Sequence, residues 1–307
     1  MRAMAYDAYG SDDALALREL PDPKVGPGEV RIQVRRAGVN PVDWKVMSGG
    51  LDGLMDAVFP VVPGWDVAGT VESVGLDTPE FDVGDEVVAY VRKDVVHGGT
   101  FAELVTMNVR GVARRSPALS WDEAGGLPLT GLTALQTLDR LVVSATDTVL
   151  VHAGAGGVGV IAIQIANARG ARVIATASPA NHDFVSELGA TPVAYGDGVV
   201  ERIRKVAPDG VDVVADFVGG VRDVTMAVLA AGGRHASIAD ATVLETGGSW
   251  FWVRPSAAGL NELGRLADSG QLRVPVAEVL PLEKLPAAFA RSREGHVRGK
   301  LVISVSG

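Results

Sequence analysis

The chain has no cysteine, and only five of its 307 residues are histidines. Without cysteine it can form no disulfide, no thiolate zinc site and no iron–sulfur cluster, and it has no thiol nucleophile. The histidines show no His-x-x-x-His or similar ligand spacing and are far apart, at His97, His152, His182, His235 and His296. We therefore expect no metal cofactor.

Positive charge and long apolar runs are also scarce. The formal net charge is −9 and the sequence pI is about 5.1, whereas a nucleic-acid-binding protein normally presents a basic face. No apolar run is long enough to span a membrane, because His152 and Gln164 interrupt the segment 149–166. Met1–Asp7 lacks the apolar core of a signal peptide. These features predict a cytoplasmic protein that binds neither nucleic acid nor membranes.

A glycine-rich turn is the most informative feature that the chain does contain. An apolar run at 149–153 is followed by Gly-Ala-Gly-Gly-Val-Gly at 154–159, by a segment with helical periodicity to 168, and by a second apolar run from Ala171. A strand that enters a helix through a G-x-G-x-x-G turn is typical of proteins that bind the pyrophosphate of a dinucleotide. The sequence therefore predicts a nucleotide site here.

Each glycine of this turn has an expected role. Gly154 permits the tight turn, Gly156 lets the backbone approach the phosphates, and Gly159 lets the helix lie close to the sheet. Free N–H groups at the start of the helix then face the negative charge of the phosphates. We assign Gly157 and Val158 to the same site.

Strand and helix patterns alternate from about residue 148, after helix signals at Ser120-Trp121-Asp122-Glu123 and 132–141. The predicted strands are 148–153, 171–177, 192–195, 211–217 and 233–238, and the helices between them are 157–169, 180–188, 199–206 and 221–231. Such alternation favours an α/β fold with a doubly wound parallel sheet of Rossmann type.

The N-terminal third shows a different pattern, of short strands separated by turn signals, which favours a twisted β-barrel. A last strand, 300–304, follows the completed parallel sheet and needs partners, so we expect it to pair with the N-terminal strands. We predict one domain from 1–119 and 256–307, and a dinucleotide-binding domain from 120–255.

Several motifs occur in a fixed order along the whole chain. They are Gly38-Val39-Asn40-Pro41-Val42-Asp43-Trp44, the segments 59–71 and 81–87, Gly98-Gly99-Thr100-Phe101-Ala102-Glu103, the segment 127–135, the glycine turn and Gly299-Lys300. This series resembles the zinc-independent medium-chain dehydrogenases/reductases of the quinone oxidoreductase-like (zeta-crystallin-like) branch. The resemblance implies a GroES-like β-barrel catalytic domain. It also implies a homodimer formed through the last strand of the nucleotide-binding sheet, at about 234–243.

Zinc-dependent members of the wider superfamily carry Gly-His-Glu where this chain has Gly64-Trp65-Asp66. Tryptophan cannot ligate zinc, and the cysteines of the two zinc sites in those enzymes are absent here. Both observations predict zinc independence.

The end of the second predicted strand bears on the choice of cofactor. An NAD site usually has an acidic residue there, which binds the ribose hydroxyls. Here the tip carries Ser178 and Asn181 and no carboxylate, which leaves room for a 2′-phosphate, so we predict NADP(H). The resembled enzymes often have a basic residue where Ala180 stands, and His182 or a nearby arginine is a candidate substitute.

Further cofactor contacts follow from the resemblance and from strand ends. The resemblance implies Tyr195 against the adenosine phosphate and Lys300 near the cofactor, the alternatives being a half-buried strand tyrosine and a surface lysine. Backbone at Phe217 and Ile238 ends the fourth and fifth strands, where ligands bind. We also expect Phe251 and Trp252 to wall the nicotinamide or to seal a domain interface.

Without a metal to polarise oxygen, an acceptor that is already electrophilic is favoured, such as an apolar quinone or α,β-unsaturated carbonyl. The protein then orients both partners and stabilises the developing oxyanion by hydrogen bonds. The candidates are Asn40, Asp43, Lys45 and Thr130, of which the first two match the N-x-x-D element that lies near the nicotinamide in the resembled enzymes. For Asp43 a helix cap is the favoured alternative.

Several questions stay open at this point. Lys45, Tyr90 or solvent could supply the proton, and the apolar segment 47–58 is either a wall of the substrate cleft or a surface loop. Reduction of enoyl thioesters on the same fold is an alternative activity. A non-catalytic NADPH-binding protein is the alternative from another class.

Overall fold

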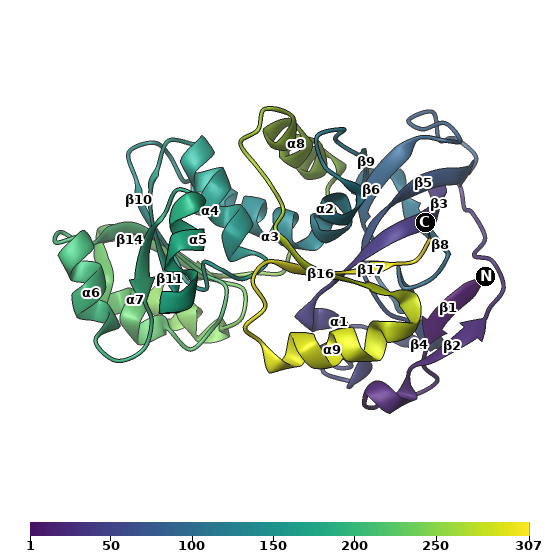
Figure 1. Cartoon of the computed structure of the whole chain (residues 1–307), viewed down its shortest axis with the longest axis horizontal. Helices are drawn as coiled ribbons and strands as arrows, with labels where there is room; N and C mark the ends of the chain where they lie inside the picture. The colour runs from purple at the N-terminus through teal and green to yellow at the C-terminus, as the bar shows by residue number, and fades with distance from the viewer. Residues whose placement is uncertain (307) are drawn as a thin grey trace. The chain divides into compact units, whose positions relative to one another are not determined.

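The computed structural model describes residues 1–306 and divides into two compact units, Met1–Leu132 with Arg254–Gly307 and Thr133–Val253 (Figure 1). The domain limits predicted above differ from these units by helix α2 (Trp121–Gly126) and the beginning of α3 (Pro128–Arg140). No helix within residues 1–306 combines the length and the apolar character needed to cross a bilayer.

The first unit is built on a seven-stranded sheet with the order β16-β17-β3-β5-β6-β9, in which β8 also pairs with β3. Its strands are β3 (Glu29–Val39), β5 (Asp66–Val74), β6 (Glu86–Tyr90), β8 (Leu104–Asn108), β9 (Val112–Arg114), β16 (Val276–Pro281) and β17 (Lys300–Ser304). The unit also holds two strand pairs, β1 (Arg2–Ala5) with β2 (Ala16–Glu19) and β4 (Ala57–Val62) with β7 (Val96–Gly98).

Strand β3 shows why this sheet forms. Val30, Ile32 and Val34 are fully buried and alternate with polar residues, as expected for a strand with one face on the core. Strand β17 pairs antiparallel with β3 and parallel with β16. This confirms the prediction that the last strand returns to the N-terminal β-structure.

Besides the start of α3, the described part of the first unit contains the α-helices α1 (Pro41–Met47), α2, α8 (Ala257–Asp268) and α9 (Leu285–Glu294). The predicted start of α2 is confirmed, because the Glu123 N–H donates to Ser120 Oγ at 3.3 Å and the Ser120 N–H donates to the Glu123 carboxylate at 3.0 Å.

The second unit holds a parallel sheet with the order β12-β11-β10-β13-β14-β15, which is the 3-2-1-4-5-6 order of a Rossmann fold. Its strands are β10 (Thr148–Val151), β11 (Arg172–Ala177), β12 (Thr191–Ala194), β13 (Val211–Asp216), β14 (Leu229–Ser237) and β15 (Ser249–Trp250). The helices between them are α4 (Gly159–Ala168), α5 (His182–Glu187), α6 (Val199–Val206) and α7 (Arg222–Val228). The predicted fold class is confirmed.

The prediction that 234–243 forms the exposed edge of this sheet is wrong. Strand β14 is covered by β15, which pairs with it in parallel through Ser249 and Trp250. A short 3₁₀ segment, Ala241–Thr246, leads the chain back to add this last strand. A two-residue strand carries no periodicity, which is why the sequence did not reveal it.

Candidate functional site

The glycine turn joins β10 to α4 and contacts β11. The Gly154 N–H donates to Thr176 O at 2.8 Å, and a Cβ at Gly154 would lie 2.7 Å from the Ala175 Cβ. The residue with a positive φ is Ala153, at 58°, so Gly154 is needed for close approach to β11 and not for its own backbone angle. The predicted reason for this glycine is thereby corrected.

The other two glycines of the motif have different surroundings. A Cβ at Gly159 would lie 2.2 Å from Ala153 O, so α4 can begin here only without a side chain. A Cβ at Gly156 would meet only Ala153 O, at 3.3 Å, and the stretch Ala155–Val158 is half-buried. The turn is a backbone cradle at the start of a ten-residue helix, and this geometry fits a pyrophosphate group.

The tip of β11 carries no carboxylate. The Asn181 side-chain amide donates to Ser178 Oγ at 3.1 Å, Ala180 is exposed, and α5 begins at His182. Nε2 of His182 is buried and has no hydrogen-bond partner within residues 1–306. A hydroxyl, an amide and an imidazole at this tip are compatible with a 2′-phosphate and do not repel it.

Two polar side chains that the sequence analysis missed fix the loops after β13 and β14. Asp216 accepts from the N–H groups of residues 218 and 219 at 2.8 and 2.9 Å, and from Ser237 Oγ at 2.7 Å. Ser237 Oγ in turn accepts from the N–H groups of residues 239 and 240. Polar residues that end two apolar strands were the available signal.

The remaining predicted cofactor residues of the second unit lie in these loops or near the sheet's end. Phe217 and Ile238 are half-buried in the loops that Asp216 and Ser237 hold. Tyr195, just after β12, is 55% exposed, so the alternative of a half-buried strand tyrosine is wrong. Phe251 packs under the Arg140 guanidinium at 4.8 Å, and Trp252 is exposed.

His152 lies buried between β10 and the glycine turn. Burial lowers its pKa to about 4, although the nearby Asp216 carboxylate favours the charged form, so the imidazole is neutral at pH 7. Nδ1 lies 3.2 Å from Thr176 Oγ1.

In the first unit, the predicted site residues Asn40, Asp43 and Lys300 meet in one buried cluster together with Asp66. Lys300 Nζ donates to Asn40 Oδ1 at 2.6 Å and to Val39 O at 2.9 Å, and it lies 3.7 Å from Asp66 Oδ2. Lys300 is only 3% exposed, so the alternative of a surface lysine is wrong. Its partner Asp66 follows Trp65 in the motif used above to argue against zinc and was not predicted as a site residue.

Two carboxyl groups share this cluster. Asp43 Oδ2 accepts from the Asn40 N–H at 2.8 Å, which confirms the helix-cap role. Asp66 accepts from Asn40 Nδ2 at 2.8 Å and from the Leu129 N–H at 2.6 Å. Burial raises the pKa of Asp43 to about 8 and that of Asp66 to about 6, where Lys300 opposes the rise.

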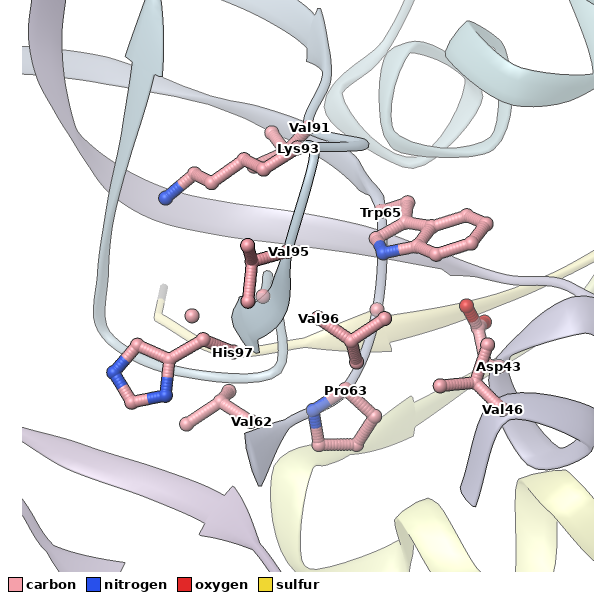
Figure 2. Close-up of a pocket in the computed structure, with 13 residues that line it drawn as sticks. Asp43, Val46, Val62, Pro63, Trp65, Val91, Lys93, Val95, Val96 and His97 are labelled. Atoms are coloured by element: carbon pink, nitrogen blue, oxygen red, sulfur yellow. The ribbon is translucent and has the colours of Figure 1, made fainter. Parts of the chain in front are cut away.

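Asp43 also lines a pocket, shown in Figure 2, together with the apolar side chains of Val46, Trp65, Val91 and Val96. Helix α1, the turn before β5, the loop after β6 and the first residue of β7 supply these side chains. In Figure 2 the Asp43 carboxylate points toward the side of the pocket that holds the Trp65 indole.

The other candidates for catalysis or proton donation have different surroundings. Lys45 is exposed on α1, with its ammonium 5.5 Å from the Trp44 ring centroid. Thr130 is buried, but its hydroxyl donates to Gly126 O at 2.9 Å. Tyr90 is fully buried and packs edge-on against Trp65, at 6.2 Å between ring centroids. Within residues 1–306 no three His, Asp or Glu side chains are grouped as metal ligands.

Comparisons with known proteins cover the whole chain. Residues 26–117 match the family described as "Alcohol dehydrogenase GroES-like domain", and residues 188–303 match the family described as "Zinc-binding dehydrogenase". The chain is 34% identical to the chloroplastic NADPH-dependent alkenal/one oxidoreductase of Arabidopsis thaliana, over 99% of this chain and 79% of that protein.

Solved structures also match this chain over nearly its whole length. The quinone oxidoreductase from Coxiella burnetii superposes with a TM-score of 0.89 at 32% identity, over 100% of this chain and 99% of the other. A mycobacterial protein solved in complex with NADPH superposes with a TM-score of 0.85 at 29% identity, over 99% of this chain and all of the other.

Proposed function

Because the chain belongs to the medium-chain dehydrogenase/reductase family, among its quinone oxidoreductases, we propose that it reduces quinones or α,β-unsaturated carbonyls with NADPH. The observation that carries this proposal is the glycine cradle beside a β11 tip that has no carboxylate. An Arabidopsis thaliana relative is named for NADPH-dependent reduction of alkenals and alkenones, which have this acceptor chemistry.

The second unit supplies the residues that would hold NADPH, which donates a hydride equivalent when bound. The backbone of 154–159 would receive the pyrophosphate, and Ser178 and Asn181 would face the 2′-phosphate. Asp216 and Ser237 would hold in place, through their hydrogen bonds, the loops after β13 and β14, which would line the nicotinamide. We also keep Tyr195, Phe251 and Trp252 in the proposal as residues that would contact NADPH.

The first unit would receive the acceptor. Asn40 uses its backbone N–H, its amide group and its side-chain oxygen within the buried cluster, so it holds Asp43, Asp66 and Lys300 together behind the pocket wall that Asp43 forms. Lys45 and Thr130 stay in the proposal as weaker candidates, because one is exposed and the other bonds to its own helix. The pocket combines the apolar side chains of Val46, Val91 and Val96 with the polar side chains of Lys93 and His97, so the proposal of an apolar acceptor rests on the sequence.

The proposed reaction needs no zinc. The support is the sequence itself, which lacks cysteine and has Trp65 where zinc-dependent enzymes have histidine. A quinone or enone is electrophilic without a Lewis acid, so hydrogen-bond donors suffice to stabilise the developing oxyanion.

We also propose a homodimer and a cytoplasmic location. A short exposed strand at a sheet edge is a common dimer interface, and β15 presents such an edge, with Trp250 43% exposed. The cytoplasmic location rests on the residue pattern of the sequence alone, and the Arabidopsis thaliana relative is described as chloroplastic.

The test is a titration of the purified protein with NADPH and NADH, followed by nicotinamide fluorescence, and then addition of 1,4-benzoquinone or an enone. We expect tight NADPH binding and acceptor-dependent loss of the signal. Turnover of a crotonyl thioester in place of both acceptors would favour the enoyl-thioester alternative. Binding without any turnover would favour the non-catalytic alternative, and no binding would refute the nucleotide site.

A further inference from the structure

The buried cluster in the first unit holds more acid than base. The side chains of Asp43, Asp66 and Lys300 are all shielded from water, and they would carry a net charge of one negative unit if all were ionised. An uncompensated buried charge is strongly unfavourable, so a carboxyl group in such a place takes up a proton instead. One of the two carboxyl groups is therefore protonated in the folded protein.

The hydrogen bonds identify which one. Asp66 accepts from Asn40 Nδ2 and from the Leu129 N–H, and it is the carboxylate within ion-pair distance of Lys300. Within residues 1–306 the Asp43 side chain accepts a single hydrogen bond, from the Asn40 N–H. Asp66 is thus stabilised as an anion and Asp43 carries the proton. Burial accordingly raises the pKa of Asp43 further than that of Asp66.

The position of the proton follows from the same contacts. Oδ2 of Asp43 accepts an N–H, so the proton belongs on Oδ1. Oδ1 is buried and has no hydrogen-bond partner within residues 1–306, and its side chain lines the pocket beside Trp65 (Figure 2). The pocket wall therefore holds an O–H donor that lacks an acceptor in the chain. In this structure Oδ1 is closed off from solvent, so a carbonyl oxygen would complete it once the side chains that cover Oδ1 move apart on binding.

We propose that Asp43 Oδ1–H binds the acceptor oxygen and gives it the proton that completes reduction, an inference that rests on the function proposed above. NADPH, when bound, would supply the hydride and with it two electrons, and the quinone or enone would then carry negative charge on its oxygen. The O–H bond of Asp43 then breaks as the O–H bond of the hydroquinone or enol forms. The resulting Asp43 carboxylate recovers its proton from solvent when the site opens, since the side chain is shielded from water in this structure.

The other titratable groups around Asp43 are less suited to this role. Figure 2 shows Lys93 and His97 at the far end of the pocket from Asp43. The Lys93 ammonium donates to Thr106 Oγ1 at 3.2 Å, and His97 Nδ1 lies 2.7 Å from a backbone oxygen. The Tyr6 phenol is buried, which raises its pKa and keeps it neutral. Lys300 is engaged by Asn40 and Asp66.

The Asp43→Asn variant tests the proposal. Its side-chain oxygen can still accept the Asn40 N–H, but it has no proton to transfer, so we expect kcat to fall about 100-fold or more. The unaltered protein should lose activity as the pH rises through about 8, and the variant should not show this fall. Asp13→Asn, at an exposed carboxyl in the first unit, is the matched control and should leave kcat unchanged.

A measurement without turnover completes the design. Infrared spectra of the protein alone should show a protonated-carboxyl band at pH 7 that disappears near pH 8 and is absent from Asp43→Asn. An Asp43→Asn variant with unchanged kcat and an unchanged pH profile would overturn the donor role and leave the proposed function standing. The same conclusion would follow if the fall in activity near pH 8 were absent from a Lys45→Met variant and still present in Asp43→Asn. If the unaltered protein reduces neither quinone nor enone, the proposed function fails and the donor role fails with it.

Discussion

Two alanine substitutions in the glycine turn should separate the folding role of this turn from its binding role. In Gly159→Ala the new Cβ would lie 2.2 Å from Ala153 O and 2.8 Å from Gly154 Cα, whereas ordinary contact begins at 3.4 Å. Both neighbours are backbone atoms that cannot rotate away. The start of α4 must therefore move by about 1 Å, and overpacking of this kind destabilises a protein by about 1–3 kcal/mol.

Gly156→Ala is the matched control for the fold. Its Cβ would meet only Ala153 O, at 3.3 Å, which a small shift relieves. Alanine also reduces the entropy of the unfolded chain, an effect of about 0.4–1 kcal/mol in favour of folding. We therefore expect its free energy of unfolding to stay within about 1 kcal/mol of the original.

The two variants should nevertheless both bind NADPH poorly. In Gly156→Ala a methyl group stands where the backbone must approach the pyrophosphate, so we expect Kd to rise at least about tenfold, or 1.4 kcal/mol. Urea unfolding and a fluorescence titration with NADPH are the two assays. Unchanged NADPH affinity in Gly156→Ala would refute the phosphate cradle, and unchanged stability in Gly159→Ala would refute the close helix contact.

Three further predictions concern the choice of cofactor, the independence from zinc and the protonation of Asp43. Ser178→Asp places a carboxylate at the β11 tip, so the ratio of the Kd for NADH to that for NADPH should fall at least about tenfold, and an unchanged ratio would remove the tip from the cofactor site. Treatment with EDTA should leave quinone reduction intact, and activity lost to EDTA and restored by zinc would refute the metal-free proposal. The folded pKa of Asp43, about 8, lies above its unfolded value, so the stability that this group contributes is present at acid pH and is lost as the pH rises through about 8. Urea midpoints between pH 5 and 9 should therefore fall less steeply in Asp43→Asn, and parallel curves would show that Asp43 is ionised in the fold.

The parallel sheet could be predicted closely because its strands are apolar runs separated by helical periodicity. Strands β10, β11 and β13 lie within one or two residues of the predicted ranges. Strand β15 could not be predicted, since two residues show no pattern and their pairing depends on β14, a distant neighbour in space. The wrong dimer edge followed directly from that omission.

In the site, too, features formed by residues close in sequence could be predicted, and features formed by residues far apart in sequence could not. The glycine turn and the cap at Asp43 are local patterns, and both could be predicted from spacing. The cluster of Lys300, Asn40 and Asp66 could not, because its members are separated by up to 260 residues and meet only when β17 joins β3. For the same reason burial of Lys300 and protonation of Asp43 were beyond a reading of the sequence.

Gly38 connects the fold to the proposed chemistry. A Cβ at this position would lie 2.6 Å from Gly125 O and 2.8 Å from Asp66 Oδ2, so Asp66 can occupy its buried place only because β3 has no side chain there. Once in place, Asp66 is the carboxylate within ion-pair distance of Lys300, and the charge of Lys300 acts more weakly on Asp43. The pairing of β17 with β3 brings Lys300 to this point of the sheet. Thus the contact that closes the β-structure also determines which carboxyl group keeps a proton at the pocket.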